Sequence, residues 1–155
     1  MEKDFFNALW ARLRTDSALV AIFAAIPLDP KLPPGSPPYK PTIRYNRARA
    51  NESFPYLVYG CKFMPDDNES FALGNGYLTV DIYDKNNDGN QRSWSMAQAI
   101  KVSLNRQSIS GSTFSAQRFF LSSSSNIPTE NEEVTRQELI FRFRYYDKSL
   151  ADPTL

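Results

Sequence analysis

The sequence predicts an α+β fold in which a single mixed or antiparallel β-sheet of about four or more strands has two main helices packed against it. Three observations lead to this prediction. Apolar residues recur at helical spacing near the N-terminus and again after residue 90. Four segments are rich in β-formers or alternate apolar and polar residues. The predicted elements follow one another as helix, strand, strand, helix, strand, strand.

The first helix is expected over the N-terminal residues, where one apolar stripe consists of Phe5, Phe6, Leu9, Trp10 and Leu13. Arg12 and Arg14 are expected on its solvent side. Asp16 is a candidate helix cap, and the apolar segment that follows it is expected to continue as a second helical piece until Pro27.

A proline-rich excursion, residues 27–53, separates these helices from the strands. Seven of the eleven prolines of the chain lie between residues 27 and 41, so this part is expected to be extended, without helix or β-ladder, and outside the core. Its second half carries Arg44, Arg47 and Arg49.

Two strands are expected at residues 56–63 and 76–83, paired across a loop over residues 64–75. In the second strand Leu78, Val80 and Ile82 share one face. The "GNG" at residues 74–76 predicts a tight turn.

The stretch "DKNNDGNQRSWS", residues 84–95, resembles an EF-hand loop, because Asp84, Asn86, Asp88 and Gly89 occupy its first, third, fifth and sixth positions. However, the twelfth position is Ser95 where a bidentate carboxylate is required, the ninth is Arg92, and a strand precedes the loop. We therefore predict a strand-to-helix turn, capped by Asp88 or Asn90, and no calcium site.

The second long helix is expected to end near Asn105 and to bury one side, formed by Trp94, Met96, Ala97, Ile100 and Leu104. A third strand is predicted at residues 112–121 and a fourth at 136–147. In the fourth strand the alternation places Leu139, Phe141, Phe143 and Tyr145 inward and Glu138, Arg142 and Arg144 outward. The serine-rich and acidic residues 122–133 between them predict a mobile loop.

The composition favours one domain over residues 1–155 and argues against several functions. The 155 residues are 41% hydrophobic, and 18 basic against 17 acidic residues give no overall field toward nucleic acid or a membrane. Cys61 is the only cysteine, which excludes an internal disulfide and suits a reducing cytoplasm. The charged first residues are unlike a signal peptide, and the longest apolar run is too short to span a bilayer.

The chain lacks the residues on which most catalytic sites depend. It has no histidine, no Walker loop, and no nucleophile elbow, and its Glu132–Glu133 pair lies in a polar segment. We therefore expect neither an enzyme nor a bound metal or cofactor.

Arginines are the strongest candidates for function, since they bind phosphates or carboxylates bidentately. The predicted interface residues are Arg44, Arg47, Arg49, Glu138, Arg142, Arg144 and Tyr146. The alternative is a solvated strand face on which Glu138 neighbours the arginines.

The order and spacing of several motifs resemble the tail-completion, or tail-terminator, proteins of long-tailed bacteriophages. These motifs are "LWARLRTDSALVAIF", "FPYLVYG", "GYLTVDIYDKNNDGN", "SMAQAIKVSL" and "QELIFRFRYYD", and they extend from about Leu9 to Asp147. The long excursion at residues 27–53 departs from the family pattern, which often has a brief loop there.

The resemblance implies a virion protein of the tail or neck, made in the bacterial host cytoplasm. Its copies would form a ring, usually of six, that caps the tail-tube protein and joins the tail to the head-completion or connector protein. DNA would pass through the lumen without specific binding, and no membrane would be involved. Three alternatives remain: another neck or tail-tube component, a nucleic-acid-binding module that uses the arginines with nearby tyrosines, and a small metal-dependent enzyme built on the Asp84 loop.

Overall fold

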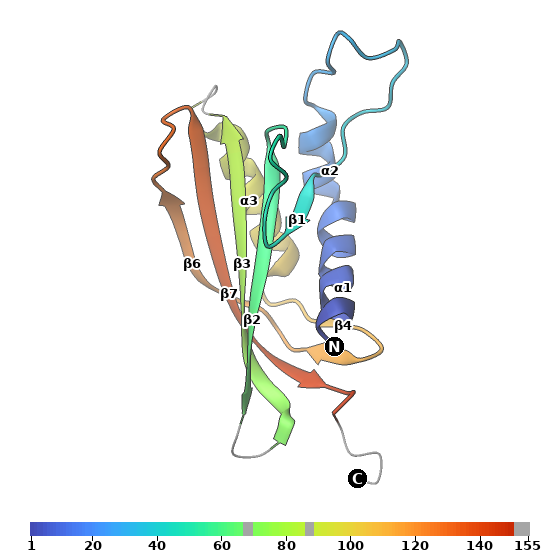
Figure 1. Ribbon diagram of the computed structural model, residues 1–155, viewed down its shortest axis with the longest axis vertical. Coiled ribbons are helices and arrows are strands. Elements are labelled where there is room, and N and C mark those ends of the chain that lie inside the picture. The colour runs from blue at the N-terminus through green and yellow to red at the C-terminus, as the bar shows by residue number, and fades with distance from the viewer. Residues whose placement is uncertain (67–69, 86–88, 151–155) are drawn as a thin grey trace.

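A computed structural model describes residues 1–66, 70–85 and 89–150, and these residues form three helices and seven strands (Figure 1). The helices are α1 (Glu2–Thr15), α2 (Ser17–Ala24) and α3 (Gln91–Leu104). The strands are β1 (Ile43–Tyr45), β2 (Tyr56–Asp66), β3 (Ser70–Lys85), β4 (Ile109–Ser110), β5 (Phe114–Ala116), β6 (Phe120–Ile127) and β7 (Val134–Asp147).

The strands form one curled sheet in the order β1-β2-β3-β7-β5-β4, and β6 also pairs with β7. All neighbours are antiparallel except β1 and β2, which run parallel. Inward side chains of β2, β3 and β7 share a hydrophobic core with residues of all three helices. The predicted α+β fold with helices packed on one mixed sheet is therefore confirmed.

The N-terminal helices bury the expected stripe, although its edges differ from the prediction. Phe5, Leu9 and Leu13 are fully buried, whereas Trp10 is 39% exposed. Asp16 is confirmed as a cap, since its Oδ1 accepts hydrogen bonds from the backbone N–H groups of Ala18 and Leu19 at 3.1 and 3.0 Å.

Arg12 and Arg14 were predicted on the solvent side of α1. In the structure both side chains are half-buried. Arg12 donates from Nε and Nη2 to the carbonyl of Ser103 at 3.0 and 2.8 Å, and Arg14 donates to the carbonyl of Pro41 at 3.3 Å. The last carbonyls of a helix have no intrahelical partners. Arg12 therefore satisfies one of these carbonyls in the last turn of α3.

The hairpin of β2 and β3 is longer than predicted, because its strands run through most of the expected loop at residues 64–75. Gly74 and Gly76 are strand residues and do not form the predicted turn. Phe143 and Tyr145 of β7 lie directly opposite, and a Cβ added at either glycine would overlap an aromatic ring. These glycines therefore make room for the core aromatics.

Part of the predicted excursion at residues 27–53 joins the core, contrary to expectation. Ile43 of β1 is 3% exposed, and the ring centres of Tyr45 and Phe6 lie 4.0 Å apart. The segment between α2 and β1 does extend away from the rest of the chain, as Figure 1 shows.

The predicted loop at residues 122–133 is wrong over its first half, since β6 continues to Ile127 and pairs with β7. The third strand, predicted at residues 112–121, is instead divided between β5 and the start of β6. A serine run carries no apolar alternation, so its strand state depends on backbone pairing with β7.

Helix α3 ends near Asn105 as predicted, but Trp94 is not on its buried side. Met96, Ile100 and Leu104 are fully buried, whereas Trp94 is 66% exposed. In a helix, residues two apart point in nearly opposite directions, so Met96 and Trp94 cannot share a face.

Within the described residues, no helix combines the length and apolar character needed to cross a membrane.

Candidate interaction surface

The outward face of the sheet carries a row of cationic and aromatic side chains across four strands. Lys62 of β2 is in register with Tyr77 of β3, Tyr77 with Arg142 of β7, and Arg142 with Phe120 of β6. Tyr77 and Phe120 are 42% and 44% exposed. Strand alternation produces this row, because the residues on either side of Arg142 in the chain are Phe141 and Phe143 of the core.

A groove of about 750 Å³ lies at this row, and we call it the basic groove. Its defining residues are Tyr77, Arg118, Phe120, Arg142 and Arg144. The guanidinium carbon of Arg142 lies 6.0 Å from the centre of the Phe120 ring, within the range of a cation–π contact. Within the part of the chain that the structure describes, no aspartate or glutamate lines the groove. Among the described residues, none of its three arginines has a carboxylate at ion-pair distance.

The floor of the groove is built from tightly packed groups. Gly76 and Phe143 line it from below, and Phe143 stacks on Phe5 of α1 with ring centres 5.4 Å apart. The backbone N–H of Gln117 donates to the carbonyl of Arg144 at 2.8 Å, which ties the segment before β6 to β7. The arginines therefore project from a fixed backbone.

Glu138 does not neutralise these arginines, although the sequence suggested it as their neighbour. It lies further along β7, where Arg136 donates to Glu138 at 3.4 Å and to Asp81 at 2.9 Å. The hydrogen bond to Asp81 raises the pKa of Arg136. This self-contained ion-pair network leaves the basic groove uncompensated.

The seven predicted interface residues lie on separate parts of the surface. Arg142 and Arg144 line the groove, and Tyr146, 37% exposed, follows on the same face of β7. The other arginines are near β1, the edge of the sheet beyond β2 and β3.

Arg44 is already paired, since its Nε and Nη2 donate to Glu52 at 2.7 and 3.2 Å. The hydrogen bond from Arg44 lowers the pKa of Glu52. Arg47 and Arg49 are exposed near this pair. The two arginine clusters of the sequence therefore do not form one patch.

Lys62, Tyr77, Arg118 and Phe120 were not predicted as site residues. Tyr77 stands between a glycine and a leucine and Phe120 between a phenylalanine and a leucine, and only the strand register places them beside Arg142. The available signal was the outward position of Tyr77 in the predicted strand at residues 76–83.

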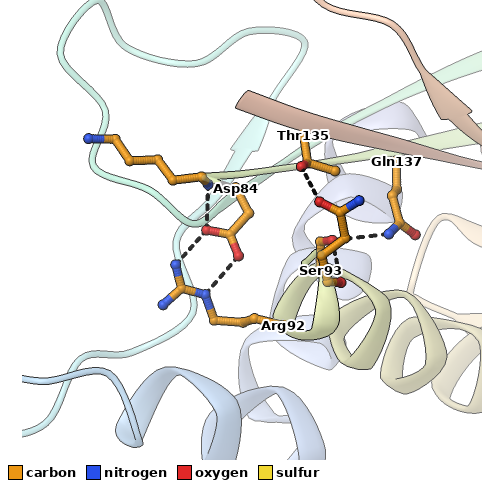
Figure 2. A network of polar contacts seen from close by, with 7 residues as sticks. Asp84, Arg92, Ser93, Thr135 and Gln137 are labelled. Atoms are coloured by element: carbon orange, nitrogen blue, oxygen red, sulfur yellow. Dashed lines mark hydrogen bonds and ion pairs between the residues drawn. The ribbon is translucent and has the colours of Figure 1, made fainter. Parts of the chain in front are cut away.

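The Asp84 turn has a structural role, because Asp84 at the end of β3 is paired with Arg92 of α3 (Figure 2). Asp84 is 1% exposed, and its carboxylate accepts from Arg92 Nε and Nη2 at 2.7 and 2.5 Å. Asn86 and Asp88, the next two positions of the EF-hand pattern, lie outside the described residues. The carboxylate at the first ligand position of that pattern is thus paired with a guanidinium, and the absence of a calcium site stays a prediction.

Asn90 precedes α3 but does not cap it with its side chain, contrary to one of the two predicted caps. Its Oδ1 instead accepts from the Thr135 hydroxyl at 2.7 Å, and Ser93 of α3 accepts from Gln137 Nε2 at 3.0 Å (Figure 2). These bonds hold the start of α3 against β7.

The described residues contain no group of three or more histidine, cysteine, aspartate or glutamate side chains placed to hold a metal ion. Burial raises the pKa of Cys61 to about 12, so its thiol stays protonated and is a poor nucleophile at neutral pH. Burial likewise raises the pKa of Tyr59 to about 12.

No family model matches the sequence, and no curated protein matches it. Solved structures do match the fold. A chain in the virion of a native gene transfer agent (GTA) particle superposes with a TM-score of 0.72 at 14% identity, over 94% of this chain and 96% of that chain. A second solved protein superposes with a TM-score of 0.61 at 10% identity, over 94% and 95%. This protein therefore has a fold that a chain of a gene transfer agent virion shares over nearly its full length.

Proposed function

We propose that this protein is a structural component of a phage-like virion and acts as its tail terminator. Its copies form a ring, expected to contain six, that caps the tail tube and joins it to the head connector. The observation that carries the proposal is the fold similarity to a virion chain over 94% of this chain. The terminator role is proposed because the order of the sequence motifs resembles tail-terminator proteins. The basic groove is the surface proposed for assembly.

The proposal includes a role without catalysis and a place in the tail or neck of the particle. The chain has no histidine, and its one thiol is held protonated by burial. The exposed outer face instead offers binding groups on rigid strands.

Particles assembled without this protein provide the test. A terminator stops tube growth, so its loss should give tails of excessive and variable length that are not joined to heads. If this protein were instead the tail-tube protein, its loss would abolish tubes. If it were a head-completion protein, its loss would leave tails of normal length. Electron micrographs of the particles separate these outcomes, and tails of normal length would contradict the terminator role.

A nucleic-acid-binding module is the second candidate, favoured by the combination of arginines with exposed aromatic rings in the basic groove. Such a module would bind single-stranded DNA with a strong dependence on salt. Fluorescence anisotropy at several salt concentrations tests this candidate, and the ring proposal expects weak binding only.

A further inference from the structure

The charge of the basic groove is complementary to an acidic partner, and this chain carries an acidic segment of its own. Residues 128–133, which we call the acidic turn, connect β6 to β7 and expose Glu130, Glu132 and Glu133. Within the described residues none of these glutamates has an ion-pair partner. The turn thus has three carboxylates without an ion-pair partner, and the groove has three arginines without one.

Side-chain hydrogen bonds hold the acidic turn in a defined shape. The hydroxyl of Thr129 donates to the carbonyls of Asn131 and Val134 at 2.6 and 2.7 Å, and Asn131 Oδ1 accepts from the backbone N–H of Glu133 at 3.0 Å. A turn held in this way loses little conformational entropy when it binds.

The acidic turn cannot reach the groove of its own chain. Ile127 at the end of β6 pairs with Arg136, whereas the groove begins at Arg142, six residues further along β7. At about 3.4 Å per residue this separation is roughly 20 Å, beyond the reach of a glutamate side chain. Contact between turn and groove must therefore join two molecules.

We propose that the acidic turn of one copy docks in the basic groove of the next copy. Glutamate carboxylates accept paired hydrogen bonds from Arg142 and Arg144, and Tyr77 and Phe120 cover the contact from water. Different surfaces of the two molecules meet, so the contact is heterologous and propagates around a ring. The inference deepens the proposed ring assembly and rests on it. A nucleic acid is a poorer occupant, because the net charge is only +1.

Charge reversal provides a sharp test with two full-length variants. Arg142→Glu with Arg144→Glu makes the groove acidic, and Glu132→Lys with Glu133→Lys makes the turn basic. In each variant alone the turn and groove repel, so we expect self-association at least about tenfold weaker by sedimentation velocity. In a 1:1 mixture every turn again meets a groove of opposite charge, and association should return. Lys3→Glu with Lys148→Glu, two exposed cations outside the groove, is the matched control and should associate like the wild type.

A disulfide trap detects the contact even where self-association is weak. In a Cys61→Ala background, a chain with Glu130→Cys is mixed with a chain carrying Gln117→Cys, which places one thiol in the turn and one in the groove. We expect a disulfide-linked heterodimer that high salt suppresses.

Each outcome has a definite meaning. A wild type that forms rings which both reversal variants also form overturns the pairing but leaves the ring proposal intact. Absence of both self-association and the disulfide overturns the pairing, and tail length still decides the terminator role separately. DNA binding that is lost in the groove variant, without recovery of association in the mixture, identifies nucleic acid as the occupant and also overturns the pairing.

Discussion

At Gly76, the absence of a side chain lets the ring of Phe143 lie directly on the backbone of β3. A Gly76→Ala change would force the ring to move within a packed core, so we expect a loss of roughly 1–3 kcal/mol in the free energy of unfolding. Asn75→Ala, one residue away on the exposed face, is the control and should change little. Urea denaturation measures both.

Combining Gly76→Ala with Phe143→Leu tests the cause. If the ring is what the added Cβ meets, the two losses will not be additive. Equal unfolding midpoints for Gly76→Ala and Asn75→Ala would contradict the packing explanation.

Asp84 is a buried carboxylate that depends on Arg92 for its compensation. Arg92→Met leaves the charge without its ion-pair partner, and we expect a loss of roughly 3–5 kcal/mol in the free energy of unfolding. The double variant Asp84→Leu with Arg92→Met removes both charges and should recover part of that loss. Thermal or urea unfolding decides, and a double variant no more stable than Arg92→Met would argue against this role.

The same ion pair bears on calcium. Because Arg92 occupies the carboxylate of Asp84, we expect calorimetric titration with millimolar calcium to show no saturable heat. Saturable binding that is lost on Asp84→Ala would overturn this expectation.

Strand β7 divides its side chains between core and surface. Leu139, Phe141, Phe143 and Tyr145 are buried and Arg142 and Arg144 are exposed, as predicted. Phe141→Ala should lower the free energy of unfolding by roughly 3–5 kcal/mol, because the ring is fully buried.

Arg142→Glu with Arg144→Glu should by contrast stay within about ±0.5 kcal/mol per substitution, since surface changes rarely affect stability more. Urea denaturation of both proteins gives the comparison. A double-glutamate variant that unfolds as easily as Phe141→Ala would mean that the arginines have a structural role.

For the whole molecule, we expect a six-fold ring in assembled tails, with the segment between α2 and β1 as a further contact arm. Most side chains of residues 27–40 are exposed in the isolated chain. Hydrogen exchange of this segment should slow on assembly, while the buried part of β7 should change little. Equal exchange in free and assembled protein would rule out the contact arm, and native mass spectrometry that finds only two-fold dimers would rule out the ring.

Local patterns in the sequence were enough to predict much of the fold. The Asp16 cap, the buried stripe of α1 and the alternation of β7 each depend on residues within one element or on its neighbours in the chain. Helical and strand periodicity fix which side chains share a face, so these features follow from spacing alone. The outward position of Arg142 and Arg144 was predicted for this reason.

Only the tertiary structure decided which elements meet. The serine run of β6 becomes a strand through its ladder with β7. The basic groove depends on the register of β3, β6 and β7, which brings Tyr77 and Phe120 to opposite sides of Arg142. Register between strands far apart in the chain is set by the packing of the whole core, and no local spacing contains it.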